Sequence, residues 1–273
     1  MRWGARIVAS GVLAALLGMA ARGALAESDD DQDSHILAAL ARPASAQPDQ
    51  DDLGQVRLSP DQAQLLVFST TDLWRQGGFA HGGVLWAPRG LDRDGPVLKL
   101  MFGGGLYHYI SGALGNTDVR GQLLAAAALP GWRFVRERFT VTAFLGYDFQ
   151  RHQLTPDDPS AGLRGSYNGV RAGIELWYQP TAATMIAADA SVSTVGPSYN
   201  ARLAAGLRAF DAFYFGPEVQ AFGADDNYQQ FRAGLHVTGF RFGEWEWSAG
   251  AGWAIDSDDR SGAYGKLGVL TRR

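Results

Sequence analysis

A two-residue alternation of apolar and polar side chains recurs from residue 64 onward, and it constrains the fold more than any other feature of the sequence. In the segment 139–152, apolar side chains occupy the odd positions from Phe139 to Phe149, whereas Asp148, Gln150 and His152 occupy even positions. Successive side chains of a β-strand point to opposite faces, so this period predicts strands between an apolar and a polar medium. The same period appears in the segments 167–179, 201–208, 213–220, 230–238 and 245–255.

Two folds satisfy this alternation: a soluble sandwich with its apolar faces inward, and a membrane barrel with its apolar face toward lipid. The segments approach the roughly nine to eleven residues that a tilted membrane strand needs, and they exceed the usual length of soluble strands. Aromatic residues collect near the segment ends, where the two interfaces of a bilayer lie. Glycines recur on the polar face, where the wall of a barrel curves: Gly146, Gly169, Gly173, Gly206, Gly216, Gly234 and Gly250. We therefore predict an all-β, antiparallel, up-and-down transmembrane β-barrel, with the sandwich as the alternative.

We expect about twelve strands, because an even number returns both termini to the periplasmic side. The expected strands are 64–75, 78–87, 96–109, 119–129, 139–152, 166–179, 183–195, 199–210, 212–222, 228–241, 245–255 and 261–270. Short connections after the sixth, eighth and tenth strands alternate with longer or acidic ones after the fifth, ninth and eleventh, as between periplasmic turns and outer loops. The first two strands alternate weakly and break this asymmetry, so ten and fourteen strands are the alternatives. The chain also ends in Leu270-Thr271-Arg272-Arg273 rather than in an aromatic residue.

The first 60 residues differ in character from the rest. Arg2 and Arg6 precede an apolar run from Ile7 to Ala20, and Ala24-Leu25-Ala26 supplies a small-x-small cleavage site, so residues 1–26 are predicted to be a secretory signal peptide. Residues 27–60 are rich in Asp, Gln and Pro, and we expect this acidic segment to be disordered. The barrel domain is expected over residues 61–273, in the outer membrane.

Composition argues against several classes of function. The net charge is −4, which gives no basic stripe for a nucleic acid, and the sequence contains no cysteine for a disulfide, a thiolate metal site or a thiol nucleophile. The sequence carries no serine-hydrolase elbow, zinc helix or phosphate loop. We therefore predict no metal, no cofactor and no catalytic residues.

The polar face of the alternation predicts which side chains fill the barrel lumen. The cations expected there are Lys99, Arg120, Arg171, Arg202, Arg208, Arg232 and Lys266, and the anions are Asp148, Glu175, Asp189, Glu218 and Glu246. One interpretation is a plug of ion pairs, because buried charges need partners. The other is a polar path or groove for a sugar polymer, in which aromatic faces stack on sugar rings. The candidate ligand-binding residues for that groove are Tyr107, Tyr109, Arg171, Glu175, Trp177, Glu218 and Arg232.

Two enzymatic alternatives depend on the same residues. Glu175 and Glu218 are a conceivable glycosidase pair, and ion pairing in the lumen explains them as well. His236 and Thr238 place an imidazole and a hydroxyl on one strand face, as in outer-membrane lipid hydrolases, but their parity points inward, away from lipid. An envelope enzyme acting on lipid or glycan, and a purely structural barrel with a filled lumen, are therefore the alternative functions.

Several motifs between residues 67 and 272 resemble the BcsS family of alphaproteobacterial cellulose biosynthesis proteins. They are Thr71-Asp72-Leu73-Trp74, Gly103-Gly104-Gly105-Leu106-Tyr107, Leu154-Thr155-Pro156-Asp157-Asp158-Pro159, Glu175-Leu176-Trp177-Tyr178-Gln179-Pro180, Gly216-Pro217-Glu218-Val219-Gln220 and Asp256-Ser257-Asp258-Asp259-Arg260-Ser261-Gly262. The resemblance implies a non-catalytic accessory role in the export, assembly or anchoring of β-1,4-glucan. It also implies cellulose and components of the cellulose synthase complex as partners, beside the outer-membrane lipid.

Overall fold

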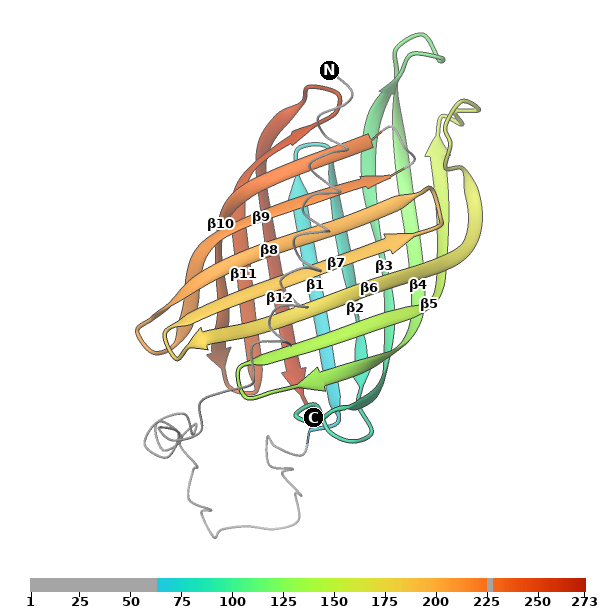
Figure 1. The fold of residues 1–273 in the computed structure, drawn as a ribbon. Coiled ribbons are helices and arrows are strands. Elements are labelled where there is room, and N and C mark those ends of the chain that lie inside the picture. Colours follow the sequence, from blue (N-terminus) through green and yellow to red (C-terminus); the bar gives the residue numbers. More distant parts are fainter. Residues whose placement is uncertain (1–62, 225–227) are drawn as a thin grey trace, which may run out of the picture.

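The computed structural model describes residues 63–224 and 228–273, and these residues form one closed barrel of twelve antiparallel strands (Figure 1). Each strand pairs with its neighbours in sequence, and β1 pairs with β12 to close the sheet. The strands are β1 (Leu65–Trp74), β2 (Gly77–Trp86), β3 (Gly95–Ser111), β4 (Thr117–Val135), β5 (Phe139–Thr155), β6 (Gly165–Thr181), β7 (Thr184–Ser193), β8 (Ser198–Ala209), β9 (Phe213–Ala224), β10 (Tyr228–Phe242), β11 (Trp245–Asp256) and β12 (Ser261–Arg272). The expected signal peptide and acidic segment lie outside the described residues.

The predicted fold and the count of twelve strands are confirmed, and most strand limits agree within two or three residues. The largest difference is β4, which was expected to stop at residue 129 and continues to Val135. Pro130 lacks the N–H that a sheet ladder needs, and it lies just past the expected limit. In the structure Leu129 and Pro130 drop out of the pairing with β5, and the pairing resumes at Gly131.

The barrel has its polar side chains inside and its large apolar side chains outside. On β5, Asp148 and His152 are buried, whereas Leu145 and Tyr147 are more than half exposed. The same inversion recurs around the wall, as at the outward Phe102, which is 67% exposed. A soluble sandwich buries its apolar face, so the sandwich alternative is wrong. In the described ranges 63–224 and 228–273, no helix is long and apolar enough to cross a membrane.

The two ends of the barrel differ. The terminus end is the one where β1 starts and β12 stops, and there Leu65 N–H donates to the Arg273 carbonyl at 2.8 Å. Strands β3 to β6 are the longest, with 17 to 19 residues, and the β3–β4 hairpin reaches farthest at the opposite, loop end, at the top of Figure 1. The predicted asymmetry of turns and loops holds after β5 and β11, where the loops 156–164 and 257–260 exceed the turns 182–183 and 243–244.

Aromatic rings gather on the outer wall near the terminus end. Trp132 and Phe134 contact each other with ring centroids 6.4 Å apart, and Phe213 contacts both Phe210 and Phe240 at 6.2 Å. These residues sit on or beside the turns that join β4 to β5, β8 to β9 and β10 to β11. They form the kind of aromatic belt that lies at a membrane interface.

A cluster of apolar side chains fills the lumen near the terminus end on the side of β1 to β5. The connection 87–94 folds inward, and its Leu91 is buried with Leu85, Val97, Leu129 and Phe144. Arg133 Nε donates to the Leu91 carbonyl at 2.8 Å and holds this connection against the wall. We call this cluster the apolar plug.

Candidate functional site in the barrel lumen

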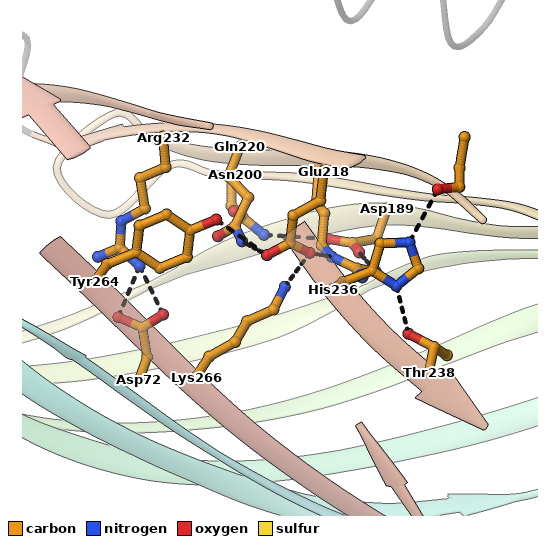
Figure 2. A network of polar contacts seen from close by, with 12 residues as sticks. Asp72, Asp189, Asn200, Glu218, Gln220, Arg232, His236, Thr238, Tyr264 and Lys266 are labelled. Carbon is orange, nitrogen blue, oxygen red and sulfur yellow. Dashed lines mark hydrogen bonds and ion pairs between the residues drawn. The ribbon is translucent and has the colours of Figure 1, made fainter. Parts of the chain in front are cut away.

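The largest polar network in the lumen centres on Glu218 of β9 (Figure 2). Its carboxylate is 1% exposed and accepts hydrogen bonds from Lys266 Nζ at 2.7 Å and Arg202 Nε at 3.0 Å. Gln220 Nε2 and the Tyr264 hydroxyl donate to its other oxygen at 2.9 and 3.1 Å. Two cations and two neutral donors therefore satisfy one buried carboxylate, as the low dielectric of an interior requires.

A second contact crosses the lumen from Arg232 on β10 to Asp72 on β1. The guanidinium is 1% exposed, and its Nη1 donates to both carboxylate oxygens at 2.8 and 2.6 Å. Its Nε donates to Gln230 at 2.6 Å, and its plane lies over the rings of Phe222 and Tyr264. In Figure 2 this pair stands beside the Glu218 network, which Tyr264 joins to it.

A third contact joins Lys99 on β3 to Glu175 on β6. The ammonium lies 5.0 Å from the ring centroid of Phe68 and 5.3 Å from that of Phe144, which belongs to the apolar plug. Like the two contacts before it, this pair links strands that are three positions apart around the wall. The lumen is therefore crossed by three ion pairs rather than merely lined by charges.

Nearer the loop end, the lumen holds a mixed polar group around Asp148 of β5. The buried carboxylate accepts hydrogen bonds from Ser193 Oγ at 2.5 Å, Arg171 Nη2 at 2.9 Å and Gln150 Nε2 at 3.0 Å. Gln150 in turn contacts His152 Nε2 at 3.2 Å. This chain of contacts leads from the charged middle of the lumen toward its mouth.

Aromatic rings lie flat against the wall at this mouth. The ring of Tyr107 stacks on Phe79 and on Tyr109, with centroids 6.5 and 6.4 Å apart and planes within 17° of parallel. Glycines make the flat arrangement possible, because a Cβ on Gly121 would lie 2.2 Å from Tyr107 Cζ and one on Gly105 would lie 2.2 Å from Phe79 Cδ1. The result is a short aromatic wall of three rings, Phe79, Tyr107 and Tyr109.

The loop 156–164 is anchored over this wall by Asp158. Its carboxylate is 1% exposed and accepts hydrogen bonds from the Ser160 hydroxyl at 2.6 Å and from the Tyr109 hydroxyl at 3.0 Å. Hydrogen bonds from Ser160 and Ser111 lower the pKa of Asp158 to about 2. The loop that follows β5 is therefore fixed to the aromatic wall by an ionised carboxylate.

Comparison with known proteins identifies the family of this chain. The family described as cellulose biosynthesis protein BcsS matches residues 66–273. The chain belongs to the BcsS family. The resemblance seen in the sequence motifs is thereby confirmed, and the chain belongs with proteins of cellulose biosynthesis. No curated protein matches the chain.

Several solved barrels resemble this BcsS protein in outline. The KdgM porin is 9% identical with a TM-score of 0.40, over 76% of this chain and 98% of the porin. The translocator domain of the autotransporter NalP from Neisseria meningitidis is 12% identical with a TM-score of 0.44, over 80% and 91% of the two chains. LpxR from Salmonella typhimurium is 10% identical with a TM-score of 0.42, over 76% and 99%.

The seven candidate ligand-binding residues of this BcsS protein fall into separate groups. Tyr107 and Tyr109 share the aromatic wall, and Trp177 lies apart from them, packed edge-on against Tyr214 near the terminus end, with centroids 5.9 Å apart. The four charged candidates each belong to one of the ion-pair groups: Arg171, Glu175, Glu218 and Arg232. The structure therefore assembles one aromatic site and several ion pairs, not a single seven-residue groove.

Arg120 does not face the lumen, contrary to expectation. On β4, Val119 and Gly121 are buried and Arg120 and Gln122 are exposed, so the even positions point outward. The run of alanines from Ala125 to Ala128 contains no polar side chain that would show which positions of this strand face the lumen, so the sequence does not indicate the direction of Arg120. Arg208 is also displaced from the lumen interior, because it lies at the end of β8 and its Nη2 donates to the Asp211 carbonyl at 3.1 Å.

Two important lumen residues were missed. Asp72, the partner of Arg232, lies on a strand whose alternation is weak. Its position between Thr71 and Leu73, which both face outward, nevertheless indicates that Asp72 faces the lumen. Leu91 lies in a connection whose sequence is typical of a polar loop, and no sequence pattern predicts that its side chain enters the barrel. The inward direction of Asp72 follows from its position in the strand, whereas the burial of Leu91 depends on the path of the loop.

The residues of the two enzymatic alternatives are engaged in other contacts. Glu218 holds two cations and Glu175 holds Lys99. His236 is 1% exposed, and its nitrogens contact Thr238 Oγ1 at 2.9 Å and the Ala205 carbonyl at 3.1 Å, inside the lumen as its parity predicted. Within residues 63–224 and 228–273, no three His, Asp or Glu side chains are grouped so that they could hold a metal ion.

Proposed function

We propose that this BcsS protein is a non-catalytic outer-membrane barrel that contacts β-1,4-glucan at its loop-end mouth and assists its export, assembly or anchoring. The observation that carries the membrane part is the inverted wall, with buried Glu218 and Arg232 inside and exposed Phe102 and Leu235 outside. A wall of this kind is stable only where an apolar solvent covers it. Export through a signal peptide ending at residue 26 is part of the same proposal.

The aromatic wall is the proposed contact for the glucan. Tyr107 and Tyr109 present two nearly parallel rings, and the apolar face of a pyranose ring packs on such surfaces. The hydroxyls of a neutral sugar need donors and acceptors beside the rings, and Gln150, His152 and Tyr167 stand next to them. A neutral polymer needs no net charge at its binding site. This agrees with the charged side chains deeper in the lumen, which neutralise one another in pairs.

We infer that glucan touches the mouth and does not thread through the barrel. Three ion pairs cross the lumen, and the apolar plug occupies part of its terminus end. Threading a polysaccharide would separate these pairs and leave desolvated charges without partners, which is costly. The filled lumen thus favours a role in guiding or anchoring polymer outside the barrel, in contact with components of the cellulose synthase complex.

The decisive experiment is complementation of a deletion strain with the unaltered gene and with Tyr107→Ala/Tyr109→Ala, while the synthase is active. We expect the deletion to lower the amount of cellulose or alter its architecture, and the double variant to fail to restore it. Trp177→Ala removes an aromatic residue of the lumen outside the mouth and serves as the matched control. Full restoration by the double variant would exclude the aromatic wall as the glucan contact.

Membrane insertion is tested separately by gel mobility of outer-membrane fractions with and without boiling. A folded barrel that resists detergent runs at a different position from the boiled chain, and the double variant must show the same shift. If the deletion changes neither the amount nor the architecture of cellulose, the role in cellulose biosynthesis proposed here is wrong, whatever the gel shows.

A further inference from the structure

The outer wall carries charge at one place. Outward positions of the described strands are mostly apolar, and the charged side chains among them are His108 on β3, Asp118 and Arg120 on β4, and Arg151 on β5. His108 and Asp118 neutralise each other, with Nδ1 and Oδ1 3.4 Å apart. Arg120 and Arg151 make no hydrogen bond or ion pair with any residue that the structure describes.

The two arginines flank a shallow groove on the outer face of β3 to β5. The strand register places Gln122 opposite Gln153 and Leu124 opposite Arg151, so the amides lie between the two cations. The groove encloses about 400 Å³. It is lined by Gly105, Leu106, Gln122, Leu123, Leu124, Arg151 and Gln153. We call the four polar residues, Arg120, Gln122, Arg151 and Gln153, the outer arginine surface.

The outer arginine surface begins where the apolar band ends. Leu106 lies opposite Gln122 and Leu124 opposite Arg151, and the next outward row toward the terminus end holds Phe102, which is 67% exposed, as is typical of a lipid-facing wall. Toward the loop end, β3 and β4 continue into the hairpin that reaches farthest at the top of Figure 1. With the proposed orientation in the outer membrane, this boundary is the level of the outer-leaflet headgroups.

We propose that the outer arginine surface binds the phosphorylated headgroup of an outer-leaflet lipid. Guanidinium groups match phosphate geometry with paired hydrogen bonds, and an unpaired cation at a membrane boundary needs such an anion. Arg120 lies opposite Thr155, four residues along β5 from Arg151, which separates the two positions by about 13 Å. That separation suits a headgroup with a phosphate at each end.

The occupant follows from the chemistry of the surface. The amides of Gln122 and Gln153 suit the hydroxyl and amide groups of a sugar headgroup, and the acyl chains extend over Leu124 and Phe102 toward the terminus end. A neutral glucan offers no anion to two guanidinium groups. A protein partner has no need of acyl-length apolar surface directly beneath its polar contacts. This inference rests on the proposed membrane function and adds a specific lipid site to it.

Native mass spectrometry of the detergent-solubilised full barrel tests the site. The probe is diphosphoryl lipid A, compared with the same lipid stripped of its phosphates. We expect the unaltered protein to retain the phosphorylated lipid at least tenfold better than Arg120→Gln/Arg151→Gln does, and to show little preference between the two lipids once both arginines are replaced. Arg241→Gln removes one exposed cation at the terminus end and should retain the lipid fully.

Equal retention by the unaltered protein and the double variant would overturn the proposal, as would equal retention of the two lipids by the unaltered protein. In that case the surface belongs to a protein partner instead. Each variant must first show the heat-dependent gel shift, which reports the folded membrane barrel. Loss of lipid retention with an intact shift therefore separates failure of this site from failure of the proposed membrane function.

Discussion

At the scale of single residues, the lumen shows how a barrel interior tolerates ions. Glu218 has two cations and two neutral donors around one carboxylate, and Arg232 has a carboxylate, an amide and two ring faces around one guanidinium. The partners of each group replace the water that it lost. Removing one of these side chains would leave buried polar partners without their hydrogen bonds or counter-charge.

Replacing Glu218 with alanine is expected to destabilise the barrel by about 3 kcal/mol, because Lys266 and Arg202 would lose their shared buried partner. The urea midpoint of unfolding from lipid vesicles measures the change. Glu244→Ala removes an exposed ion pair with Arg273 and should shift the midpoint little. A similar midpoint for the two variants would mean that the lumen is wet enough to solvate both cations.

A methyl group at Gly121 is expected to disrupt the aromatic wall, because its Cβ would lie 2.2 Å from Tyr107 Cζ and the ring must move. Gly121→Ala should therefore lower retention on cellulose as much as Tyr107→Ala does. Gly112→Ala is the matched control, since a Cβ there meets no atom within 4 Å. Unchanged retention by Gly121→Ala would show that the stacked position of the ring is not the one that binds glucan.

At the scale of elements, the hairpins of β3 to β6 form the longest part of the wall, and β3 carries two rings of the aromatic wall, Tyr107 and Tyr109, on its inner face. The loop 156–164 is tied to that face through Asp158, which bridges Ser160 and Tyr109. A lowered pKa means that the ionised carboxylate stabilises the anchored loop. This contribution is complete above the pKa of an unfolded aspartate, about 3.9, and disappears as the pH falls through about 2.

The loop 156–164 is accordingly expected to resist pepsin at pH 4 and to be cut increasingly as the pH falls toward 2. Cutting is measured against a free peptide of the same sequence, which corrects for the pH dependence of the protease. Asp158→Asn should allow cutting throughout this range, whereas Asp157→Asn, which alters an exposed ion pair with Arg164, should keep the resistance. An unaltered pH profile in Asp158→Asn would remove the carboxylate from this role.

At the scale of the whole molecule, the barrel is a closed sheet, and ion pairs cross its lumen. Closure removes the free sheet edges, and the three ion pairs join strands that are not neighbours in the sheet. Twelve strands lie between the narrow barrels that side chains fill and the wide ones that leave an aqueous channel. The lumen contents therefore decide whether this barrel conducts ions.

The unaltered protein is expected to conduct poorly in a planar bilayer. Lys99→Ala/Glu175→Ala removes both partners of one crossing pair together, so the conductance should rise at least twofold without loss of the barrel. Glu244→Ala/Arg273→Ala, an exposed pair at the terminus end, should leave the conductance as it was. A large conductance in the unaltered protein would favour passage of polymer through the lumen instead.

The sequence by itself determined where the strands lie, and it favoured twelve strands over ten or fourteen and the inverted barrel over the sandwich. The alternation of apolar and polar side chains in a segment such as 139–152 depends only on the medium that each face of the strand contacts. It can therefore be read from the local sequence. It also placed Glu218, Arg232 and His236 inside. The direction of Arg120, the inward path of Leu91 and the partners of each lumen ion were decided only by the tertiary structure. These features depend on register, loop path and contacts between strands far apart in the chain, and no local pattern encodes them.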